Sequence, residues 1–86
     1  MYYVYMLRCG DGSLYSGITT DLDRRLKAHN SGKGAKYTRS RLPVSLAYFE
    51  EAEDRSQASK REFELKKLTR TQKEKLVEQF SDLQPI

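Results

Sequence analysis

The stretch YYVYMLRCGDGSLYSGIT, residues 2–19, decides how this chain of 86 residues begins to fold. Residues 2–8 alternate along the backbone and are rich in the aromatic and β-branched side chains that favour strands. An Asp-Gly turn signal follows in CGDGS, and residues 14–19 have the pattern of a second strand. The sequence therefore predicts an antiparallel hairpin at its start.

The tyrosines of this hairpin raise the question of which face they occupy. If strand partners have numbers with an even sum, Tyr5, Tyr15 and Gly17 lie on one face. A slip of one residue would separate the two tyrosines, so this expectation depends on the register. Taken alone, each tyrosine is explained by packing on a half-buried strand. The same register gives the opposite face four apolar side chains: Val4, Met6, Leu14 and Ile18.

A first helix is expected after the hairpin. Thr20 followed by Asp23 resembles a capping box, and acidic residues suit a helix N-terminus. The segment NSGKG ends this helix, and residues 32–43 are expected to form a basic loop closed by Pro43. One face of the helix presents residues at i, i+3, i+4 and i+7, namely Leu22, Arg25, Leu26 and His29.

A third strand, VSLAYFEE, completes the predicted sheet. Alternation along it places Val44, Leu46 and Tyr48 on one side. With the order ββαβαα, the sequence predicts an α+β domain with a three-stranded, mostly antiparallel sheet flanked by helices. This single domain spans residues 1–80, and residues 81–86 are expected to be a frayed tail.

Two helices are expected after the third strand. Asp54 with Gln57 supplies a start signal for the first of them, and Thr69 with Gln72 supplies one for the second. Both helices carry a stripe of apolar residues at helical spacing. The stripes consist of Ala58, Leu65 and Leu68, and of Leu76, Val77 and Phe80.

Composition limits the class of protein. Hydrophobic residues make up 37% of the chain and charged residues 33%, which suits one small domain. No run of about 18 apolar residues is present, so we expect no membrane span. The start MYYVYMLRCG lacks the features of a secretion signal, and the single Cys9 allows no internal disulfide. A cytoplasmic protein is expected.

Positive charge is concentrated in the middle of the chain. The net charge is only +4, yet no acidic residue occurs between Arg24 and Phe49, a window that holds seven cations. A solvated surface is the usual explanation of a charge run. Here glycine, hydroxyl and aromatic residues are interleaved with the cations. The composition therefore supports nucleic-acid binding about as well as it supports a solvated surface.

Three polar residues on the predicted helices could carry chemistry. Glu62 borders an apolar stripe, where a carboxylate needs a partner; a salt bridge is the simpler explanation and a bound cation the other. His29 lies four residues after Arg25, so the two can meet on one face. In the simpler explanation His29 lies at an interface and Arg25 is solvated. In the other, His29 transfers protons beside an Arg25 that binds a phosphate.

Four segments together resemble the GIY-YIG nuclease family over about residues 2–77. They are YVY at 3–5, YSG at 15–17, DLDRRLKAH at 21–29 and a glutamate on a later helix. The chain is most similar to the small stand-alone bacterial members. This resemblance implies a nuclease that hydrolyses phosphodiester bonds with one Mg²⁺ or Mn²⁺ ion. The expected substrate is DNA, and RNA is the alternative. No base-reading element is recognisable, so little sequence specificity is expected.

The resemblance also implies roles for individual residues. The catalytic set would be Tyr5, Tyr15, Arg25, His29 and Glu62. Glu62 would hold the metal ion, with Glu64 as the alternative. Tyr5 and His29 would together orient and deprotonate the attacking water, and either could be the base. The nucleic-acid contacts would come from Gly17, Lys33, Lys36, Tyr37, Arg39 and Arg41.

Two other functions remain compatible with the sequence. The first is a nucleic-acid-binding module with the same fold and weak or no catalysis. The second is a small basic scaffold for protein interactions. Loss of cleavage without loss of binding on substitution of Glu62 distinguishes the nuclease from the module, and salt-dependent affinity for nucleic acid distinguishes both from the scaffold.

Overall fold

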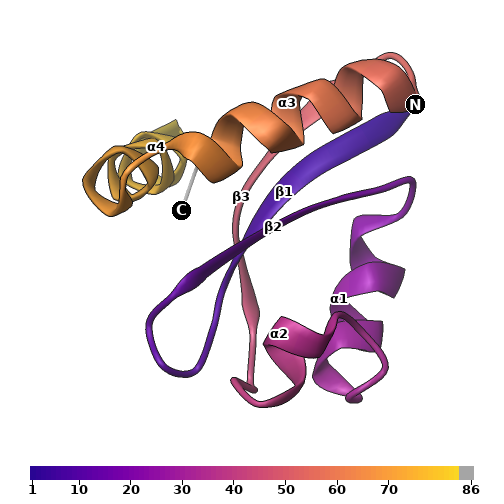
Figure 1. The fold of residues 1–86 in the computed structure, drawn as a ribbon, viewed down its shortest axis with the longest axis vertical. Helices are drawn as coiled ribbons and strands as arrows, with labels where there is room; N and C mark the ends of the chain where they lie inside the picture. The colour runs from indigo at the N-terminus through magenta and orange to yellow at the C-terminus, as the bar shows by residue number, and fades with distance from the viewer. Residues whose placement is uncertain (84–86) are drawn as a thin grey trace.

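The structure, a computed structural model, describes residues 1–83. Within this range the strand order is β2-β1-β3 and both pairings are antiparallel. Figure 1 shows a twisted sheet with helices on two sides, which confirms the predicted α+β class. The elements are β1 (Tyr2–Arg8), β2 (Leu14–Thr19), α1 (Leu22–Asn30), α2 (Lys36–Arg39), β3 (Ser45–Ala52), α3 (Arg55–Lys67) and α4 (Arg70–Leu83).

The hairpin of β1 and β2 has the even-sum register. Tyr5 lies opposite Gly17 and Leu7 opposite Tyr15, so the two tyrosines share a face. The turn between the strands is closed by a hydrogen bond from the Cys9 amide to the Ser13 carbonyl. Gly12 takes a φ of 88° there, a conformation that favours glycine.

The third strand corrects one expectation. The sequence places Val44, Leu46 and Tyr48 on one side, but the pairing of β1 with β3 shifts by one residue between Met6 and Leu7. Tyr48 therefore lies opposite Met6 and packs on one face of the sheet, whereas Val44 is buried on the other. A β-bulge adds one residue to a strand and reverses the alternation beyond it.

The caps of the helices explain where they begin. Asp21, rather than Thr20, is the N-cap of α1, because the Asp21 side chain accepts a hydrogen bond from the Arg24 amide. The predicted cap of α3 is confirmed, since Asp54 accepts from the Gln57 amide. At α4 the amides of Thr69 and Gln72 each donate to the other's side chain, a complete capping box.

Two segments differ from the predicted boundaries. The expected basic loop at residues 32–43 contains a short helix, α2, in its middle. Helix α4 continues through Leu83, so residues 81–83 are helical instead of frayed, and the last three residues of the predicted tail lie outside the described range. No helix within the described range is both long and apolar enough to cross a membrane.

The sheet separates two buried clusters. On one face Val4 and Met6 of β1 pack against α3 and α4. Ala58 and Leu65 of α3 are fully buried in this contact. On the other face lie Tyr5 and its neighbours, covered by α1 and the segment around α2. The second cluster consists of the buried Tyr5, Leu7, Cys9 and Val44, with Leu22 and Leu26 of α1 packed against it.

Candidate active site

Tyr5 lies at the centre of the site because of its partner on the edge strand. Its phenol ring crosses the backbone of Gly17, and a Cβ atom at position 17 would stand 2.5 Å from the Tyr5 hydroxyl oxygen. Only glycine leaves room for this crossing. The hydroxyl is thereby carried over β2, the edge strand nearest to it, while Tyr5 as a whole is only 2% exposed.

His29 of α1 is the hydrogen-bond partner of this hydroxyl. The Tyr5 hydroxyl oxygen is 3.0 Å from Nε2 of His29, which is fully buried. The other ring nitrogen, Nδ1, is 2.8 Å from the hydroxyl oxygen of Thr38 in α2. Tyr15 packs edge-to-face on the His29 ring with centroids 5.5 Å apart. The predicted juxtaposition of the two tyrosines with His29 is present in the structure.

The environment shifts the pKa values of both proton-carrying groups. Burial raises the pKa of Tyr5 above its ordinary value of 10.0, the Arg25 guanidinium opposes this, and Tyr15 and Glu62 add to it. Burial, assisted by the positive charge of Arg25, lowers the pKa of His29 below 6.5. At neutral pH the pair is therefore an uncharged phenol beside an uncharged imidazole.

Glu62 approaches from the opposite layer of the domain. It lies on α3, which packs on the other face of the sheet, yet its charge acts on the Tyr5 hydroxyl. The side chain of Glu62 is 23% exposed and forms an ion pair of 3.4 Å with Lys66. Glu64 is instead 52% exposed and pairs with Arg61, which also binds Glu50. Of the two glutamates, Glu62 is the less exposed and is the one whose charge raises the pKa of Tyr5.

A single carboxylate is a workable anchor for a hard divalent cation. In residues 1–83, three or more His, Cys, Asp or Glu side chains nowhere gather in a way that could hold a metal ion. Mg²⁺ is commonly bound by one or two carboxylates, with waters and substrate phosphate oxygens completing its shell. The partly buried Glu62, which is 23% exposed, fits this donor set.

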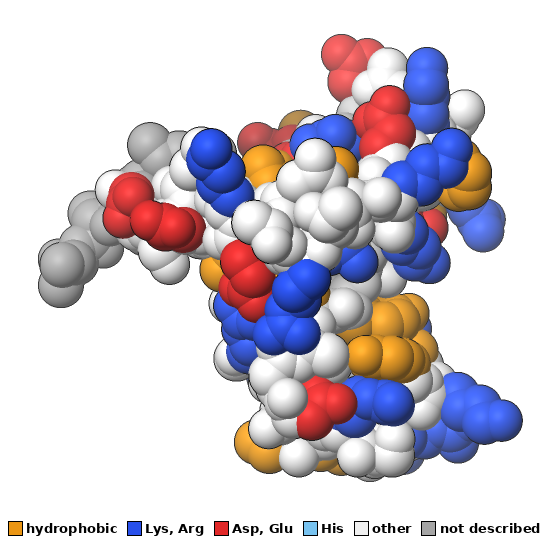
Figure 2. Space-filling model, turned by 60° about the vertical axis from the view of Figure 1, so that its left-hand side comes forward, with side chains coloured by type: hydrophobic (Ala, Val, Ile, Leu, Met, Phe, Trp, Pro, Cys, Tyr) orange, Lys and Arg blue, Asp and Glu red, His pale blue; other side chains and the backbone are white. Residues whose placement is uncertain are grey.

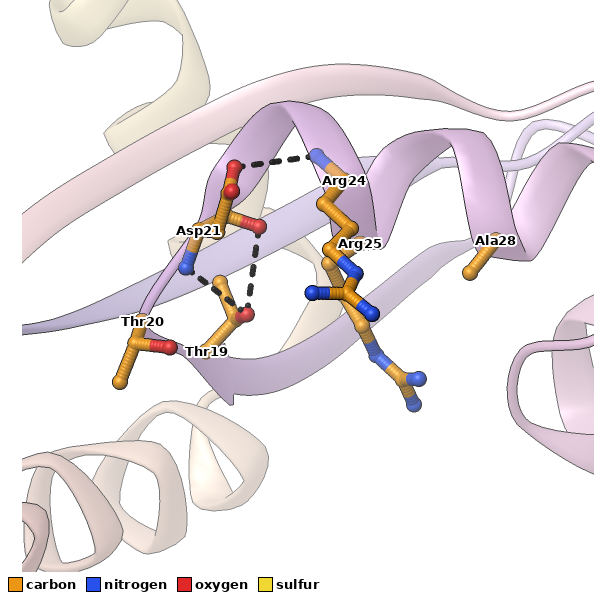
Figure 3. Close-up of a pocket in the computed structure, with 6 residues that line it drawn as sticks. All are labelled: Thr19, Thr20, Asp21, Arg24, Arg25 and Ala28. Atoms are coloured by element: carbon orange, nitrogen blue, oxygen red, sulfur yellow. Dashed lines mark hydrogen bonds between the residues drawn. The ribbon is translucent and has the colours of Figure 1, made fainter.

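Arg25 stands at an open cavity of about 480 Å³ beside α1. Figure 3 shows the guanidinium groups of Arg24 and Arg25 extending away from the helix on the same side. Arg24 was visible in the sequence only as part of the basic run. The cavity is lined by Thr19, Thr20, Asp21, Arg24, Arg25 and Ala28, and these two guanidinium groups could bind an anion such as a phosphate.

The segment around α2 divides into exposed cations and residues that close the site. Lys33, Lys36 and Arg39 are exposed. Arg41 differs, because its guanidinium is 3.0 Å from Asp11 and 2.9 Å from the Tyr37 carbonyl oxygen. Its positive charge is thus partly neutralised within the protein.

Tyr37 and Thr38 connect the same segment to the aromatic cluster. Tyr37 stacks on Tyr15 with ring centroids 5.9 Å apart, and the Arg41 guanidinium lies over the Tyr37 ring. Thr38 and Gly34 both contact His29, and neither was among the predicted site residues. Their position beside a basic, glycine-containing run was the only sequence signal, and it suggested nucleic-acid contact rather than a partner for the histidine.

The surface around the site suits a polyanion. Figure 2 shows Lys and Arg side chains above and below a hollow on the right-hand side of the molecule, with hydrophobic side chains within it. Such a surface attracts a phosphate backbone and releases its counterions.

The sequence of this chain is similar to one family model and to those of known proteins. The family model described as the GIY-YIG catalytic domain matches residues 1–75. A UPF0213 protein of Haloquadratum walsbyi is 51% identical over 82 residues, which cover 95% of this chain and 92% of that protein. A UPF0213 protein of Clostridium perfringens is 57% identical over 77 residues, covering 90% and 83%.

Two solved structures are similar as well. The solution NMR structure of a UPF0213 protein from Bacillus halodurans has a TM-score of 0.57 and 52% sequence identity, with coverage of 91% of this chain and 84% of that one. The solution NMR structure of a protein from E. faecalis has a TM-score of 0.61 and 48% identity, with coverage of 99% and 91%.

Proposed function

We propose that this chain, which belongs to the GIY-YIG family, is a metal-dependent nuclease that hydrolyses phosphodiester bonds in DNA with little sequence specificity. One observation carries the proposal. The buried Tyr5 hydroxyl is hydrogen-bonded to an uncharged His29 and is electrostatically coupled to both Arg25 and Glu62. Hydrolysis of a phosphodiester needs a proton acceptor, a cationic donor and an anchor for a metal ion, and these groups supply one of each.

Glu62 would hold one Mg²⁺ or Mn²⁺ ion through its carboxylate oxygens. The bound ion would neutralise negative charge on the scissile phosphate and on its leaving oxygen. Glu62 would release Lys66 to do so, and Lys66, exposed on the same helix, would then be free to contact the nucleic acid.

Tyr5 and His29 would act as a proton relay. Because the pKa of Tyr5 is raised, its hydroxyl is protonated at neutral pH, and the phenol cannot be the final proton acceptor. The lowered pKa of His29 keeps its imidazole uncharged and able to accept a proton. As the water oxygen bonds to phosphorus and the P–O bond to the leaving group breaks, the water proton moves to the Tyr5 oxygen and the Tyr5 proton moves to His29.

The remaining residues would bind and orient the substrate. Arg25 would donate to non-bridging phosphate oxygens, a task that suits its planar fork. Arg24, at the same cavity, would contact the same or a neighbouring phosphate. Tyr15 would position the phosphate. Gly17, expected to contact the nucleic acid, is buried under the Tyr5 ring, so its part would be to leave room for that ring. The exposed Lys33, Lys36, Tyr37 and Arg39 would follow the sugar–phosphate backbone without reading bases.

Cleavage assays test the proposal. Supercoiled plasmid, single-stranded DNA, branched oligonucleotides and RNA would be incubated with Mg²⁺ or Mn²⁺, with and without a chelator. We expect chelator-sensitive nicking of at least one DNA by the wild type. Glu62→Ala should lose cleavage and keep DNA binding, whereas the matched control Glu64→Ala, on the same helix, should keep both.

A binding module with the same fold is the second candidate. It is favoured by the burial of both Tyr5 and His29, since an attacking water must reach the hydroxyl of a residue that is 2% exposed. If neither metal supports cleavage of any of these nucleic acids while salt-dependent binding persists, the module replaces the nuclease.

A further inference from the structure

We propose that Thr38 is a positioning residue that fixes the tautomer of His29, so that Nε2 is left free to accept the proton of Tyr5. The geometric part of this inference concerns only protons within the buried network. Its catalytic part rests on the proposed nuclease function. Both parts follow from counting the hydrogens that the network has available.

The Thr38 hydroxyl has one hydrogen, and the structure assigns it a partner. The hydroxyl oxygen is 2.9 Å from the carbonyl oxygen of Ala35, the N-cap residue of α2. In this arrangement the Thr38 hydrogen is donated to the Ala35 carbonyl, which also accepts from the amides of Thr38 and Arg39. Toward any other partner the Thr38 oxygen can then only accept a hydrogen bond.

This direction determines which nitrogen of His29 carries hydrogen. Nδ1 lies 2.8 Å from the Thr38 oxygen, and two acceptors cannot share a hydrogen bond without a donor. With the Thr38 hydrogen on the Ala35 carbonyl, Nδ1 is the nitrogen that carries the hydrogen. In an uncharged imidazole the other nitrogen, Nε2, is then an acceptor, and the Tyr5 hydroxyl at 3.0 Å donates to it.

The opposite tautomer would break the relay. With the hydrogen on Nε2, His29 would donate to the Tyr5 oxygen, and the Tyr5 hydrogen would have no acceptor on the ring. The Thr38 hydroxyl would also have to turn away from the Ala35 carbonyl in order to donate to Nδ1 inside a buried site. A buried hydroxyl hydrogen without an acceptor is unfavourable, so the Tyr5 hydroxyl favours the productive tautomer.

Packing holds the ring in this orientation. Thr38 and His29 are both fully buried. A Cβ atom at Gly34 would collide with Nδ1 of His29, so the chain before α2 lies directly against the ring. The charged and titratable groups around His29 are Tyr5, Tyr15 and Arg25, and Arg25 opposes a second proton on the imidazole. The basic segment around α2 therefore also supports the histidine ring.

The tautomer can be measured directly because the chain has one histidine. In untagged, ¹⁵N-labelled protein above pH 7, the two imidazole nitrogens give distinct chemical shifts for the protonated and unprotonated atom. We expect the Nδ1–H form in the wild type and in Thr38→Ser, which keeps the hydroxyl. Thr38→Val, which keeps the shape alone, should shift the population toward Nε2–H.

Kinetics provide the second readout. For Thr38→Val we expect kcat to fall about 10- to 100-fold, by analogy with the loss of a group that orients a metal-binding histidine, with KM unchanged and with Thr38→Ser restoring most of the rate. A wild-type Nε2–H form, or an unchanged tautomer in Thr38→Val, would overturn the inference, and so would a shifted tautomer with an unchanged kcat. If the wild type cleaves no nucleic acid, the tautomer shift still supports the geometric part while the nuclease proposal fails.

Discussion

Both faces of the sheet bury apolar side chains, but only one of them also buries a connected set of polar side chains among the described residues. Against α3 and α4 the fully buried residues are Val4, Met6, Ala58 and Leu65, all apolar. On the face toward α1 and α2, Tyr5, His29 and Thr38 are buried almost as completely, and each carries polar atoms. We call these the apolar face and the polar face.

This difference indicates that the two faces have different roles. Apolar burial contributes about 25 cal/mol per Å², whereas burial of a polar group is unfavourable unless its hydrogen bonds are satisfied. The polar face satisfies them through one chain of contacts from Tyr5 through His29 to Thr38 and Ala35. In a domain of this size we infer that the apolar face supplies most of the stability and the polar face the chemistry.

Tyrosine substitutions on the two faces should give the largest contrast. Tyr5→Phe removes the hydroxyl that relays the proton, and we expect kcat for DNA cleavage to fall about 10²- to 10⁴-fold. Tyr48→Phe removes a hydroxyl that binds Glu50 beside the other cluster, and it should leave kcat unchanged. Single-turnover cleavage at saturating protein measures both. Equal rates for the wild type and Tyr5→Phe would contradict these roles.

A core truncation on the apolar face tests the other half of the comparison. Leu65→Ala should lower the free energy of unfolding by about 2–5 kcal/mol, because Leu65 is fully buried between α3 and the sheet. The control Leu46→Ala, at a residue 36% exposed, should cost much less. Urea denaturation gives both values. The folded fraction of Leu65→Ala should keep its intrinsic cleavage rate.

Acid should destabilise the two faces in separate pH ranges. The pKa of His29 is lowered by burial, so the unfolded chain takes up its proton near pH 6.5 while the folded protein resists it, and stability falls as the pH drops below about 6.5. Glu74 is bound by Arg8 and Arg70, which lower its pKa from 4.5 to about 2, so its contribution is complete above about pH 4.5 and is lost on the way to about pH 2.

Variants assign each of these two ranges to its residue. His29→Gln should flatten the upper part of the curve of unfolding free energy against pH, and Glu74→Gln should flatten the lower part. If either variant leaves its own part of the curve unchanged, that residue is not the source of the pH dependence.

The smallest expected effect concerns the exposed cations of the polar face. Lys36→Ala should reduce the slope of log affinity for DNA against log salt by about 1, because one phosphate contact is lost. Arg41→Ala should change the slope less, since Arg41 already binds Asp11 and the Tyr37 carbonyl. Fluorescence anisotropy at several salt concentrations gives both slopes, and equal effects would show that Arg41 contacts the nucleic acid directly.

The sequence predicts those parts of the fold that depend on local periodicity. The alternation of β1 and β2 and the Asp-Gly turn predicted the hairpin, and of the registers that were open the structure has the one that brings Tyr5 opposite Gly17. The caps at Asp54 and Thr69 depend on contacts three residues apart, which a sequence displays directly. The β-bulge in β3 was not predictable in this way, because it is set by the fit of one strand to its partner rather than by the strand's own pattern.

The candidate site shows the same limit. Motif positions pointed to Tyr5 and His29, which are 24 residues apart and form a hydrogen bond. Thr38 was missed because its hydroxyl meets His29 only through the path of the chain after α1, and no spacing rule links the two residues. Arg41 looked like its basic neighbours, and only the fold reveals its pairing with Asp11.

The most direct test of the account is to locate the metal ion on the protein. Mn²⁺ broadens nearby amide signals in a ¹H–¹⁵N spectrum, and it would be added to the labelled protein in the presence of a non-cleavable DNA. The account predicts broadening centred on Glu62 that extends across the sheet to Tyr5 and Gly17, and its loss in Glu62→Gln. Broadening centred elsewhere, or unchanged in Glu62→Gln, would contradict the claim that one carboxylate from α3 completes the polar face as a metal-dependent site.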